Sequence, residues 1–482
     1  MLNRQYPYFS LVTDDEAIRI RDAAMTILCK SGFRMESRML LEAAEKRGFQ
    51  VDFAKQWIAV TPDMFTALEG CARRHAPEAN KETVLRRLPS DGFKLGRNIV
   101  KRVDWATKES RQAVMADNIE IMKACHMLPD VSAVAPLFTG SDIVSAIEPI
   151  VGMAHALTIS DKPFGGIEMM SGGQLPWLER LDTLKQGKEV RYDHGWASIT
   201  RFTLDRRAAS CLEAIHQKNS LKGWGTNSCP FAGMNAPVTV AGSAALAMAE
   251  MMGGWLAGWI LNDEAILYCT PVSGTLDMRT TRILFSTPQA TLIDALLYQV
   301  FNRLYSLENG ADCAATYVDG KIPGLQAVHD KMFKTLSMFS LTGCNVGIHF
   351  GMLEAGGSLS PAQMVLDFEL NREMEQITQG ISLDNDALGL DTILETGVEG
   401  DYLTTDHTLD RYKTSLWQSN LFDCSCFGDA DTEFRKDHIA LERAQSVYDG
   451  ALARYEPITV DAGMRRDVDA VLAGARKELL NH

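Results

Sequence analysis

The chain has 482 residues, a length that suits either several domains or one large α/β core. Its apolar fraction of 46% and charged fraction of 23% are ordinary for a soluble globular protein. The formal net charge of -14 argues against a surface for nucleic acid or anionic membranes, because both require a basic footprint. We therefore expect small molecules or proteins as partners, and a homo-oligomer is a further option.

Three helices are predicted near the start of the chain, over residues 14–31, 37–47 and 61–75. Thr13 and Glu16 have the spacing of a capping box for the first helix, and Gly32 supplies its stop. We interpret residues 1–97 as an N-terminal helical cap. The polar, turn-rich stretch 77–96 marks its boundary.

From residue 98 onward short apolar segments alternate with helical stretches, which is typical of a parallel α/β fold. The candidate strands cover residues 98–106, 132–138, 162–168, 196–202, 221–227, 265–269, 311–317 and 345–351. Eight strands predict a (β/α)8 TIM barrel over residues 98–370. The first strand contains Lys and Arg, which suit a sheet edge better than a barrel interior. Without that strand seven remain, and a doubly wound sheet is the alternative. No glycine-rich phosphate loop follows any strand, which removes the commonest reason for that alternative.

A long apolar helix is predicted from Val238 to Leu261, with Glu250 as its only formal charge. The run is long enough to span a membrane. Its many Ala and Gly residues, its central Glu and the absence of a basic flank favour a buried core helix. A later helix is expected to begin near Thr287 and Pro288.

Residues 371–482 are predicted as helices joined by acidic loops, ending in an amphipathic helix over 461–480. They are too polar to form a second core, so we expect a C-terminal helical extension packed on the barrel. The ten cysteines show no CxxC pair, and residues 1–17 lack the apolar core of a signal peptide. A cytoplasmic location with reduced thiols is therefore expected.

In a barrel, the chemistry lies at the carboxyl ends of the strands. The aromatic candidates on or after the strands are Phe138, Trp196, Phe231, Tyr268, Tyr317 and Phe350. The polar candidates are Asp142, Glu168, Arg201, Asn227 and His349. Taken singly, such residues are more often structural, as core aromatics or helix caps, so their convergence on one face is what indicates a site. His349 stands out because it lies in an otherwise apolar strand, where an imidazole needs a partner.

Metal ligation has no sequence signature here. No HxxxH, HxH or cysteine cluster at ligand spacing is present, and His155, His194 and His216 are isolated. We predict no metal, with a site assembled from distant residues as the alternative.

Four segments carry a resemblance to a known family. They are NAPVTVAGSAALAMAE from Asn235, ILYCTPVSGTLDMRT from Ile266, HFGMLEAGGSLS from His349 and DYLTTDHTLDRY from Asp401. Together they resemble the trimethylamine methyltransferase family of corrinoid-dependent enzymes, and weaker similarity covers nearly all the chain. The founding amine enzymes carry pyrrolysine, whereas this chain has only the twenty ordinary residues. It therefore resembles the non-pyrrolysine branch, and in particular the glycine betaine:corrinoid methyltransferases.

The resemblance implies that a methyl group moves from a quaternary amine, most simply glycine betaine, to the Co(I) of a corrinoid protein, giving dimethylglycine. A quaternary nitrogen already bears a full positive charge, so attack on its methyl releases a neutral amine without a covalent activator or strong acid. The chain must supply positioning, an aromatic and carboxylate environment for the cation, and access for the corrinoid. We expect the six aromatic candidates to form the cage, and His349 and Arg201 to be available for the substrate carboxylate. No tightly bound cofactor is expected.

Several alternatives stay open at this level. Proline betaine, carnitine and γ-butyrobetaine differ from glycine betaine by contacts that no motif reports. A TIM-barrel lyase or hydrolase could use Glu168 or Asp142 as a base. A non-catalytic binder of corrinoid proteins would keep the fold without binding an amine.

Overall fold

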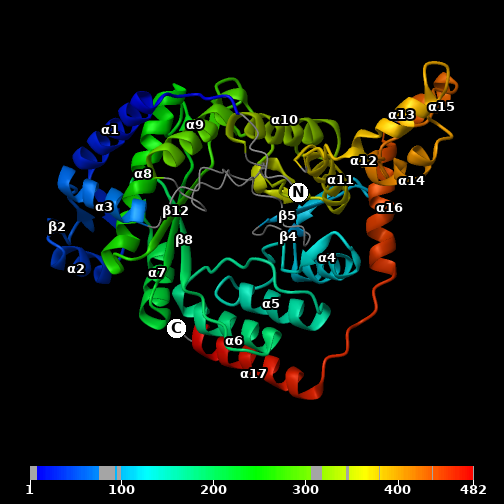
Figure 1. Cartoon of the computed structure of the whole chain (residues 1–482). Coiled ribbons are helices and arrows are strands. Elements are labelled where there is room, and N and C mark those ends of the chain that lie inside the picture. Colours follow the sequence, from blue (N-terminus) through cyan, green and yellow to red (C-terminus); the bar gives the residue numbers. More distant parts are fainter. Residues whose placement is uncertain are drawn as a thin grey trace.

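The computed structural model describes residues 8–74, 93–94, 99–305, 317–343, 347–378, 380–436 and 438–480. It shows a mixed α/β protein whose elements follow one another around a ring (Figure 1). Helices α8 (Val240–Leu261) and α9 (Pro288–Tyr305) lie on one side of the ring, and α5 (Glu148–Ile159) lies on the other. The described cysteines are free thiols.

The three N-terminal helices are confirmed as α1 (Asp14–Ser31), α2 (Arg38–Lys46) and α3 (Pro62–Arg74). The Thr13 hydroxyl accepts from the backbone NH of Glu16 at 3.3 Å, and the Glu16 carboxylate accepts from the NH of Thr13 at 2.8 Å. The helix ends before Gly32, whose φ of 65° is in the left-handed region that favours glycine. The predicted linker 77–96 lies outside the described residues, apart from the backbone of the short strand β4 (Phe93–Lys94).

Helix α8 is a core helix, as its composition predicts. It has the length and hydropathy of a membrane span, but most of it is buried inside the protein. Its glycines allow close packing, because a Cβ at Gly253 would lie 2.4 Å from the Phe33 ring and one at Gly258 would lie 2.6 Å from Trp224. Thr239 caps its first turn by accepting from the NH of Gly242 at 3.3 Å.

Three predicted strands are confirmed as a parallel sheet of β8 (His194–Ile199), β10 (Gly223–Ser228) and β12 (Ile266–Pro271). Because side chains alternate along a strand, Ala197, Ile199 and Trp224 face the helices and are buried. The residues that alternate with these along each strand face the interior of the ring. The register aligns Trp196 with Gly225 and Gly225 with Tyr268.

The other predicted strands are short, irregular or outside the described residues. Strand β5 (Lys101–Asp104) forms an antiparallel hairpin with β6 (Glu109–Gln112), and β7 (Val131–Ala133) pairs with β4. Residues 162–168 contribute only a bridge between Phe164 and Val134, because Pro163 has no NH to donate and Gly165 and Gly166 weaken an extended strand. Residues 311–316 and 345–346 lie outside the described part of the chain.

The strands of the described residues group into separate small sheets, and their pairings alone do not trace a closed ring. The prediction that His349 ends a strand is wrong, because the described residues 347–349 are irregular. Two buried charges replace the strand pairing there. Lys331 Nζ donates to the carbonyl oxygen of His349 at 3.0 Å, and the Asp367 carboxylate accepts from the NH of Gly351 at 2.7 Å.

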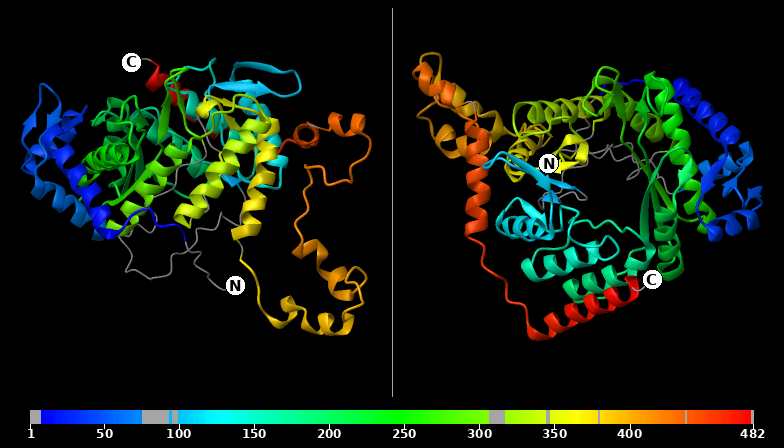
Figure 2. Two further views of the ribbon diagram at one scale, coloured as in Figure 1. Left: turned by 90° about the horizontal axis from the view of Figure 1, so that it is seen from above. Right: turned by 180° about the vertical axis from the view of Figure 1, so that it is seen from behind.

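The C-terminal part has two helices that pack on the body. Helix α16 (Ile439–Ala453) packs on α11 (Pro361–Thr378) and on α4 (Met115–Met127), and α17 (Ala462–Leu479) packs on α5 and on α6 (Leu175–Gln186). The predicted boundary at 370–371 falls inside α11. Between α11 and α16, the segment with α12 (Asn385–Leu388), α13 (Leu390–Thr396) and α14 (Asp406–Ser415) projects away from the body (Figure 2).

Candidate functional site

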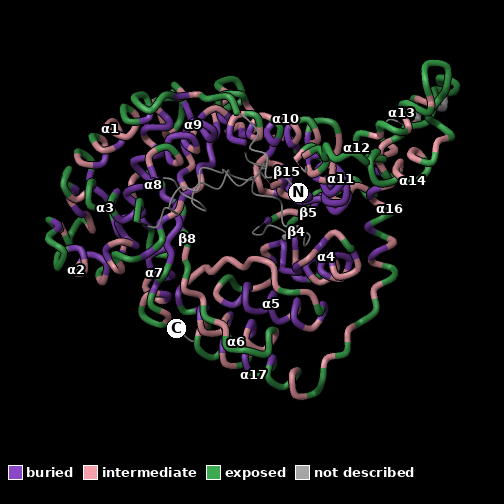
Figure 3. The backbone as a smooth tube through the Cα atoms, viewed as in Figure 1, coloured by how far each residue is buried: buried purple, intermediate pink, exposed green. Residues whose placement is uncertain are grey.

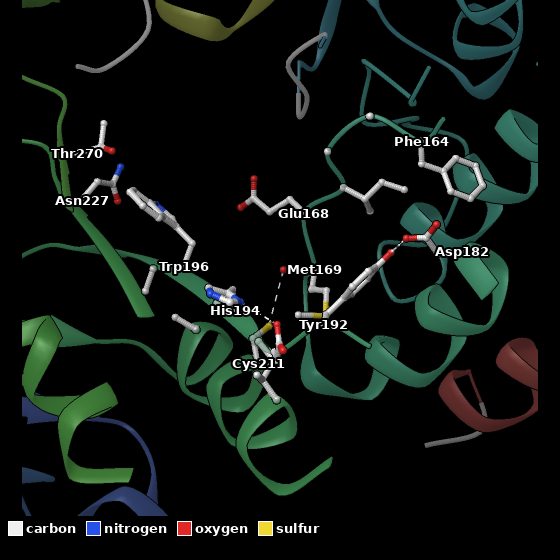
Figure 4. Close-up of a pocket in the computed structure, with 18 of the residues that line it drawn as sticks. Phe164, Glu168, Met169, Asp182, Tyr192, His194, Trp196, Cys211, Asn227 and Thr270 are labelled. Carbon is white, nitrogen blue, oxygen red and sulfur yellow. Dashed lines mark hydrogen bonds and ion pairs between the residues drawn. The ribbon is translucent and has the colours of Figure 1, made fainter. Parts of the chain in front are cut away.

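A cavity of about 1320 Å³ lies between the inner face of the three-stranded sheet and the irregular segment 163–169 (Figure 4). Helix α7 (Arg206–Asn219) and the segments carrying Tyr317 and His349 complete its wall. The cavity is larger than the roughly 300–1,000 Å³ typical of small-molecule pockets. It is therefore the candidate functional site.

The inner face of the sheet presents a pair of aromatic rings to this cavity. The ring centroids of Trp196 and Tyr268 are 5.3 Å apart with an interplanar angle of 35°. Gly225 lies between them in the register, and a Cβ there would come within 2.1 Å of both rings. The Tyr268 hydroxyl donates to the carbonyl oxygen of Gly195 at 2.9 Å, which fixes its ring. Trp196 remains 43% exposed, which is unusual for so large an apolar side chain and leaves a face for a ligand.

The next row of inward residues is polar. Ser198, Asn227 and Thr270 are aligned across the three strands and all line the cavity. The side-chain oxygen of Asn227 is buried without a hydrogen-bond partner among the described residues. A buried amide oxygen in this state is costly, so this row is suited to a polar ligand group or an ordered water.

Glu168 and Arg207 provide opposite charges on the far side of the cavity. The Glu168 carboxylate and the Arg207 guanidinium are 3.4 Å apart, and both side chains are about two-fifths exposed. In Figure 4, Glu168 points into the space that Trp196 and Asn227 face from the sheet. This side of the cavity can thus attract a cation to the carboxylate and an anion to the guanidinium.

Tyr317 and His349 line a third part of the wall. Their ring centroids are 5.4 Å apart in an edge-to-face arrangement. Tyr317 also contacts Phe285 at 5.4 Å, and Phe285 contacts Phe231 at 5.7 Å, so an aromatic chain runs from the protein interior to the cavity. The His349 Nδ1 lies 3.3 Å from the sulfur of Met352.

Two phenols and one thiol of this wall have raised pKa values and are neutral at pH 7. Burial raises the pKa of Tyr268 to about 12, and burial also raises that of Tyr317. Burial raises the pKa of the Cys211 thiol to about 11, so this cysteine is not a thiolate nucleophile. These side chains are suited to contact and orientation rather than to proton transfer or covalent catalysis.

The structure brings together six of the eleven residues predicted from the sequence. Those that line the cavity are Glu168, Trp196, Asn227, Tyr268, Tyr317 and His349. The other five, Phe138, Asp142, Arg201, Phe231 and Phe350, do not line it.

Phe231 packs on Phe285, and the other four each have another place in the fold. Phe138 is buried in the core, and Phe350 packs on Phe368 with ring centroids 5.0 Å apart. The Asp142 carboxylate accepts from the NH of Met115 at 2.8 Å and so caps α4. Arg201 lies in a turn after β8 with a φ of 53°.

Sequence reasoning missed Arg207, His194 and Tyr192 as residues that line the cavity. Arg207 lies in the first turn of α7, where Asp205 caps the helix by accepting from the NH of Ala208 at 2.8 Å. A search that continued past the end of the predicted strand 196–202 into the next helix would have found it. No such local signal marks Tyr192, whose hydroxyl donates to Asp182 at 3.0 Å in the cavity wall.

Within the described residues, no group of three or more His, Cys, Asp or Glu side chains could hold a metal ion. The site is therefore described by its aromatic, carboxylate, guanidinium and amide groups.

Comparison with known proteins adds an independent result. A family model described as trimethylamine methyltransferase (MTTB) matches residues 1–479. A glycine betaine methyltransferase from Desulfitobacterium hafniense strain Y51 is 22% identical over 496 residues, covering 98% of each chain. A trimethylamine methyltransferase MttB from D. hafniense strain DCB-2 is 24% identical over 434 residues, covering 86% of this chain and 84% of its own. A trimethylamine methyltransferase MttB2 from Methanosarcina mazei is 27% identical over 249 residues, about half of each chain.

Proposed function

Because the chain belongs to the trimethylamine methyltransferase family, we propose that it transfers a methyl group from a quaternary amine to the Co(I) of a corrinoid protein. Glycine betaine is the substrate we propose first, since a glycine betaine methyltransferase matches the chain over 98% of both lengths. The observation that supports this most is the exposed Trp196 face beside Tyr268, opposite the Glu168 carboxylate.

The proposed substrate fits the charges of the cavity. A trimethylammonium group binds best over the faces of Trp and Tyr rings, and Glu168 supplies the opposite charge. The substrate carboxylate would bind to His349, with Arg207 as the second partner in place of the predicted Arg201. A zwitterion held at both ends presents one methyl in a fixed direction, which is the positioning that displacement requires.

The reaction itself demands little acid or base from the protein. The carbon–nitrogen bond breaks with its electron pair going to nitrogen, which turns a cation into a neutral amine. The corrinoid supplies the nucleophile that accepts the methyl group. The neutral phenols of Tyr268 and Tyr317 and the neutral thiol of Cys211 suit this, because none competes as a nucleophile. The volume of about 1320 Å³ leaves space beside a small betaine for the acceptor to approach.

We also propose that residues 98–370 form the (β/α)8 barrel, with residues 1–97 as its cap and 371–482 as its extension. The parallel pairings support this because they join neighbours in chain order. Ile99 pairs with Phe138, Val134 pairs with Phe164, and β8, β10 and β12 pair in sequence. The last strand region returns to the first, since β16 (Ser358–Leu359) pairs in parallel with β5.

A panel of betaines tests the function. The chain is incubated with reduced cobalamin and glycine betaine, proline betaine, carnitine or γ-butyrobetaine, and the change from Co(I) to methyl-Co(III) is followed by absorbance. We expect methylation with glycine betaine and none with trimethylamine, whose nitrogen carries no fixed charge. Turnover of trimethylamine at the rate of a betaine would contradict the argument that the donor nitrogen needs a fixed positive charge. Methylation by none of these donors would refute the proposed activity.

The substitution His349→Ala tests the proposed contact with the substrate carboxylate. We expect methyl transfer to fall on the order of a hundredfold, because a displaced methyl group costs about that much. The melting temperature should change little, since the turn is held through backbone atoms that the substitution keeps. A large fall in melting temperature with near wild-type methylation by the remaining folded protein would assign His349 a structural role.

A further inference from the structure

Three polar side chains lie at the rim of the cavity. We call Ser198, Asn227 and Thr270 the polar row. Each is the last residue but one of its strand, and the three strands are parallel, so the row lies at the carboxyl-end edge of the sheet. Trp196 and Tyr268 come two residues earlier in their strands, about 6.6 Å deeper at roughly 3.3 Å per residue. A ligand that approaches from this edge therefore meets the polar row before it meets the aromatic pair.

The polar row has hydrogen-bonding capacity that the described residues leave unused. The Asn227 side-chain oxygen is buried without a partner among them, and no hydrogen bond joins the hydroxyl of Ser198 or Thr270 to another described residue. Asn227 and Thr270 point into the cavity from the sheet (Figure 4). Ser198 is exposed and the other two are half-buried, although the strands run through a part of the chain with many buried residues (Figure 3). A ligand that supplies the missing partner of the Asn227 oxygen gains affinity.

The betaine of the proposed function cannot supply that partner. Its nitrogen carries four carbon substituents and no hydrogen, and its carboxylate is ionised at pH 7, so it offers only acceptors. The Asn227 oxygen is itself an acceptor and needs an N–H or O–H group. The polar row also carries no charge, whereas Glu168 and Arg207 already provide opposite charges for the two ends of a zwitterion. The partner of the row is therefore the other molecule that the proposed reaction brings to the cavity.

We propose that the polar row binds primary amide side chains of the corrin ring, the macrocycle that holds cobalt in the methyl acceptor. These amides lie around the edge of the ring, so they meet the cavity wall while the cobalt faces the centre. A primary amide has two N–H donors and one carbonyl acceptor, and it can exchange two hydrogen bonds with the amide of Asn227. The hydroxyls of Ser198 and Thr270 can donate to or accept from neighbouring amides. This inference rests on the proposed function, which brings a corrinoid to this cavity.

The two layers of the sheet then serve different substrates. The trimethylammonium group lies over Trp196 and Tyr268, and the corrin lies nearer the rim, against the polar row. Hydrogen bonds from the row fix how the ring is turned and how far it enters, which sets the distance from cobalt to the methyl group. Because a misplacement of about 1 Å can cost on the order of a hundredfold in rate, Asn227 is a positioning residue.

The test compares two corrinoids that differ in their side chains. Cobinamide keeps the amides, whereas cobyrinic acid heptamethyl ester carries methyl esters, which accept hydrogen bonds but cannot donate them. Each is titrated into the full chain without betaine, and the absorbance of the corrin reports binding. The quantity measured is the ratio of the affinity for cobinamide to the affinity for the ester. We expect this ratio to be about tenfold higher in the wild type than in Asn227→Leu, roughly the contribution of one or two hydrogen bonds.

Gln186→Leu is the matched control. Gln186 also lines the cavity with a primary amide, but it is the last residue of α6, which precedes the amino end of β8. Its amide donates to the Asp182 carboxylate at 2.9 Å. This variant should keep the wild-type ratio. If Asn227→Leu does not fold, Thr270→Val and Ser198→Ala each remove one hydroxyl, and each should lower the ratio severalfold.

Three results would overturn the proposal. A ratio that is the same in the wild type and in the row variants would leave the row to ordered water. Binding of neither corrinoid by the wild type would exclude the ring from this site. A loss of affinity in Asn227→Leu for carnitine but not for γ-butyrobetaine, which lacks the carnitine hydroxyl, would assign the row to a substrate hydroxyl.

These measurements separate the inference from the proposed function, because binding requires no methyl transfer. A chain that shows the expected ratio but methylates no corrinoid refutes the proposed function alone. A chain that methylates Co(I) but whose ratio does not depend on the polar row refutes this inference alone.

Discussion

The substitution Trp196→Leu isolates the contribution of the aromatic face to binding of the quaternary amine. Trp196 lies 5.3 Å from Tyr268 and faces the cavity, so a trimethylammonium group on this pair lies within the roughly 6 Å at which a ring attracts a cation. A desolvated contact of this kind contributes about 2 kcal/mol. At about 1.4 kcal/mol per tenfold, binding should weaken roughly 30-fold.

The assay compares two ligands of the same shape. Glycine betaine and its neutral-headed isostere 3,3-dimethylbutyrate are titrated into wild type and Trp196→Leu by calorimetry. Trp196→Leu should lower the affinity for the cation strongly and the affinity for the isostere only slightly, because Leu keeps an apolar surface. The free energy of unfolding should fall by only about 1 kcal/mol, the contribution of an aromatic pair, since Trp196 is 43% exposed.

Two results would refute the reasoning. An equal loss for both ligands would show that Trp196 contributes apolar packing and not attraction to a cation. Unchanged affinity for glycine betaine in a variant that melts like the wild type would place the ammonium group elsewhere in the cavity.

Three further predictions concern positions around the site. Gly225→Ala should abolish betaine binding in a protein that still folds, because the new Cβ would lie 2.1 Å from both cage rings, and circular dichroism with calorimetry checks this. Lys331→Met should destabilise the fold by about 3–5 kcal/mol in urea titrations, because it leaves the buried Asp367 carboxylate without its cation, whereas a loss below 1 kcal/mol would contradict the ion pair. Burial raises the pKa of Glu250 in the folded state, so the fold favours its protonated form, and stability from this group is present below pH 4.5 and lost as pH rises through the folded pKa. Glu250→Gln should therefore match the wild type at pH 4 and exceed it at pH 8 in denaturant melts, and a constant difference across that range would speak against the raised pKa.

Local sequence signals were sufficient for most helices of this protein. The capping box of α1 and the Pro at the start of α9 depend on residues within one turn of each other. Such signals lie close together in the chain, so the sequence predicts them. The central strands were predicted for a similar reason, because alternation of side chains is a property of the strand itself.

Which strand-end residues meet in the site was predicted only in part. Trp196, Asn227 and Tyr268 lie on the inner face of three adjacent strands, and knowledge of the strands was enough to bring them together. By sequence, Phe138 and Phe350 were equally good candidates for the site, yet both are core residues.

Only the tertiary structure decided where His349 lies. Lys331 and Asp367 are 36 residues apart, and their buried ion pair forms only when α10 (Leu325–Thr342) packs on α11. That pair then binds the carbonyl of His349 and the NH of Gly351 in place of a neighbouring strand. A buried charge binds a backbone group that three-dimensional packing brings close to it, because leaving the charge unpaired costs more free energy than breaking a strand. The linear sequence does not show which backbone groups lie close to Lys331 and Asp367 in space.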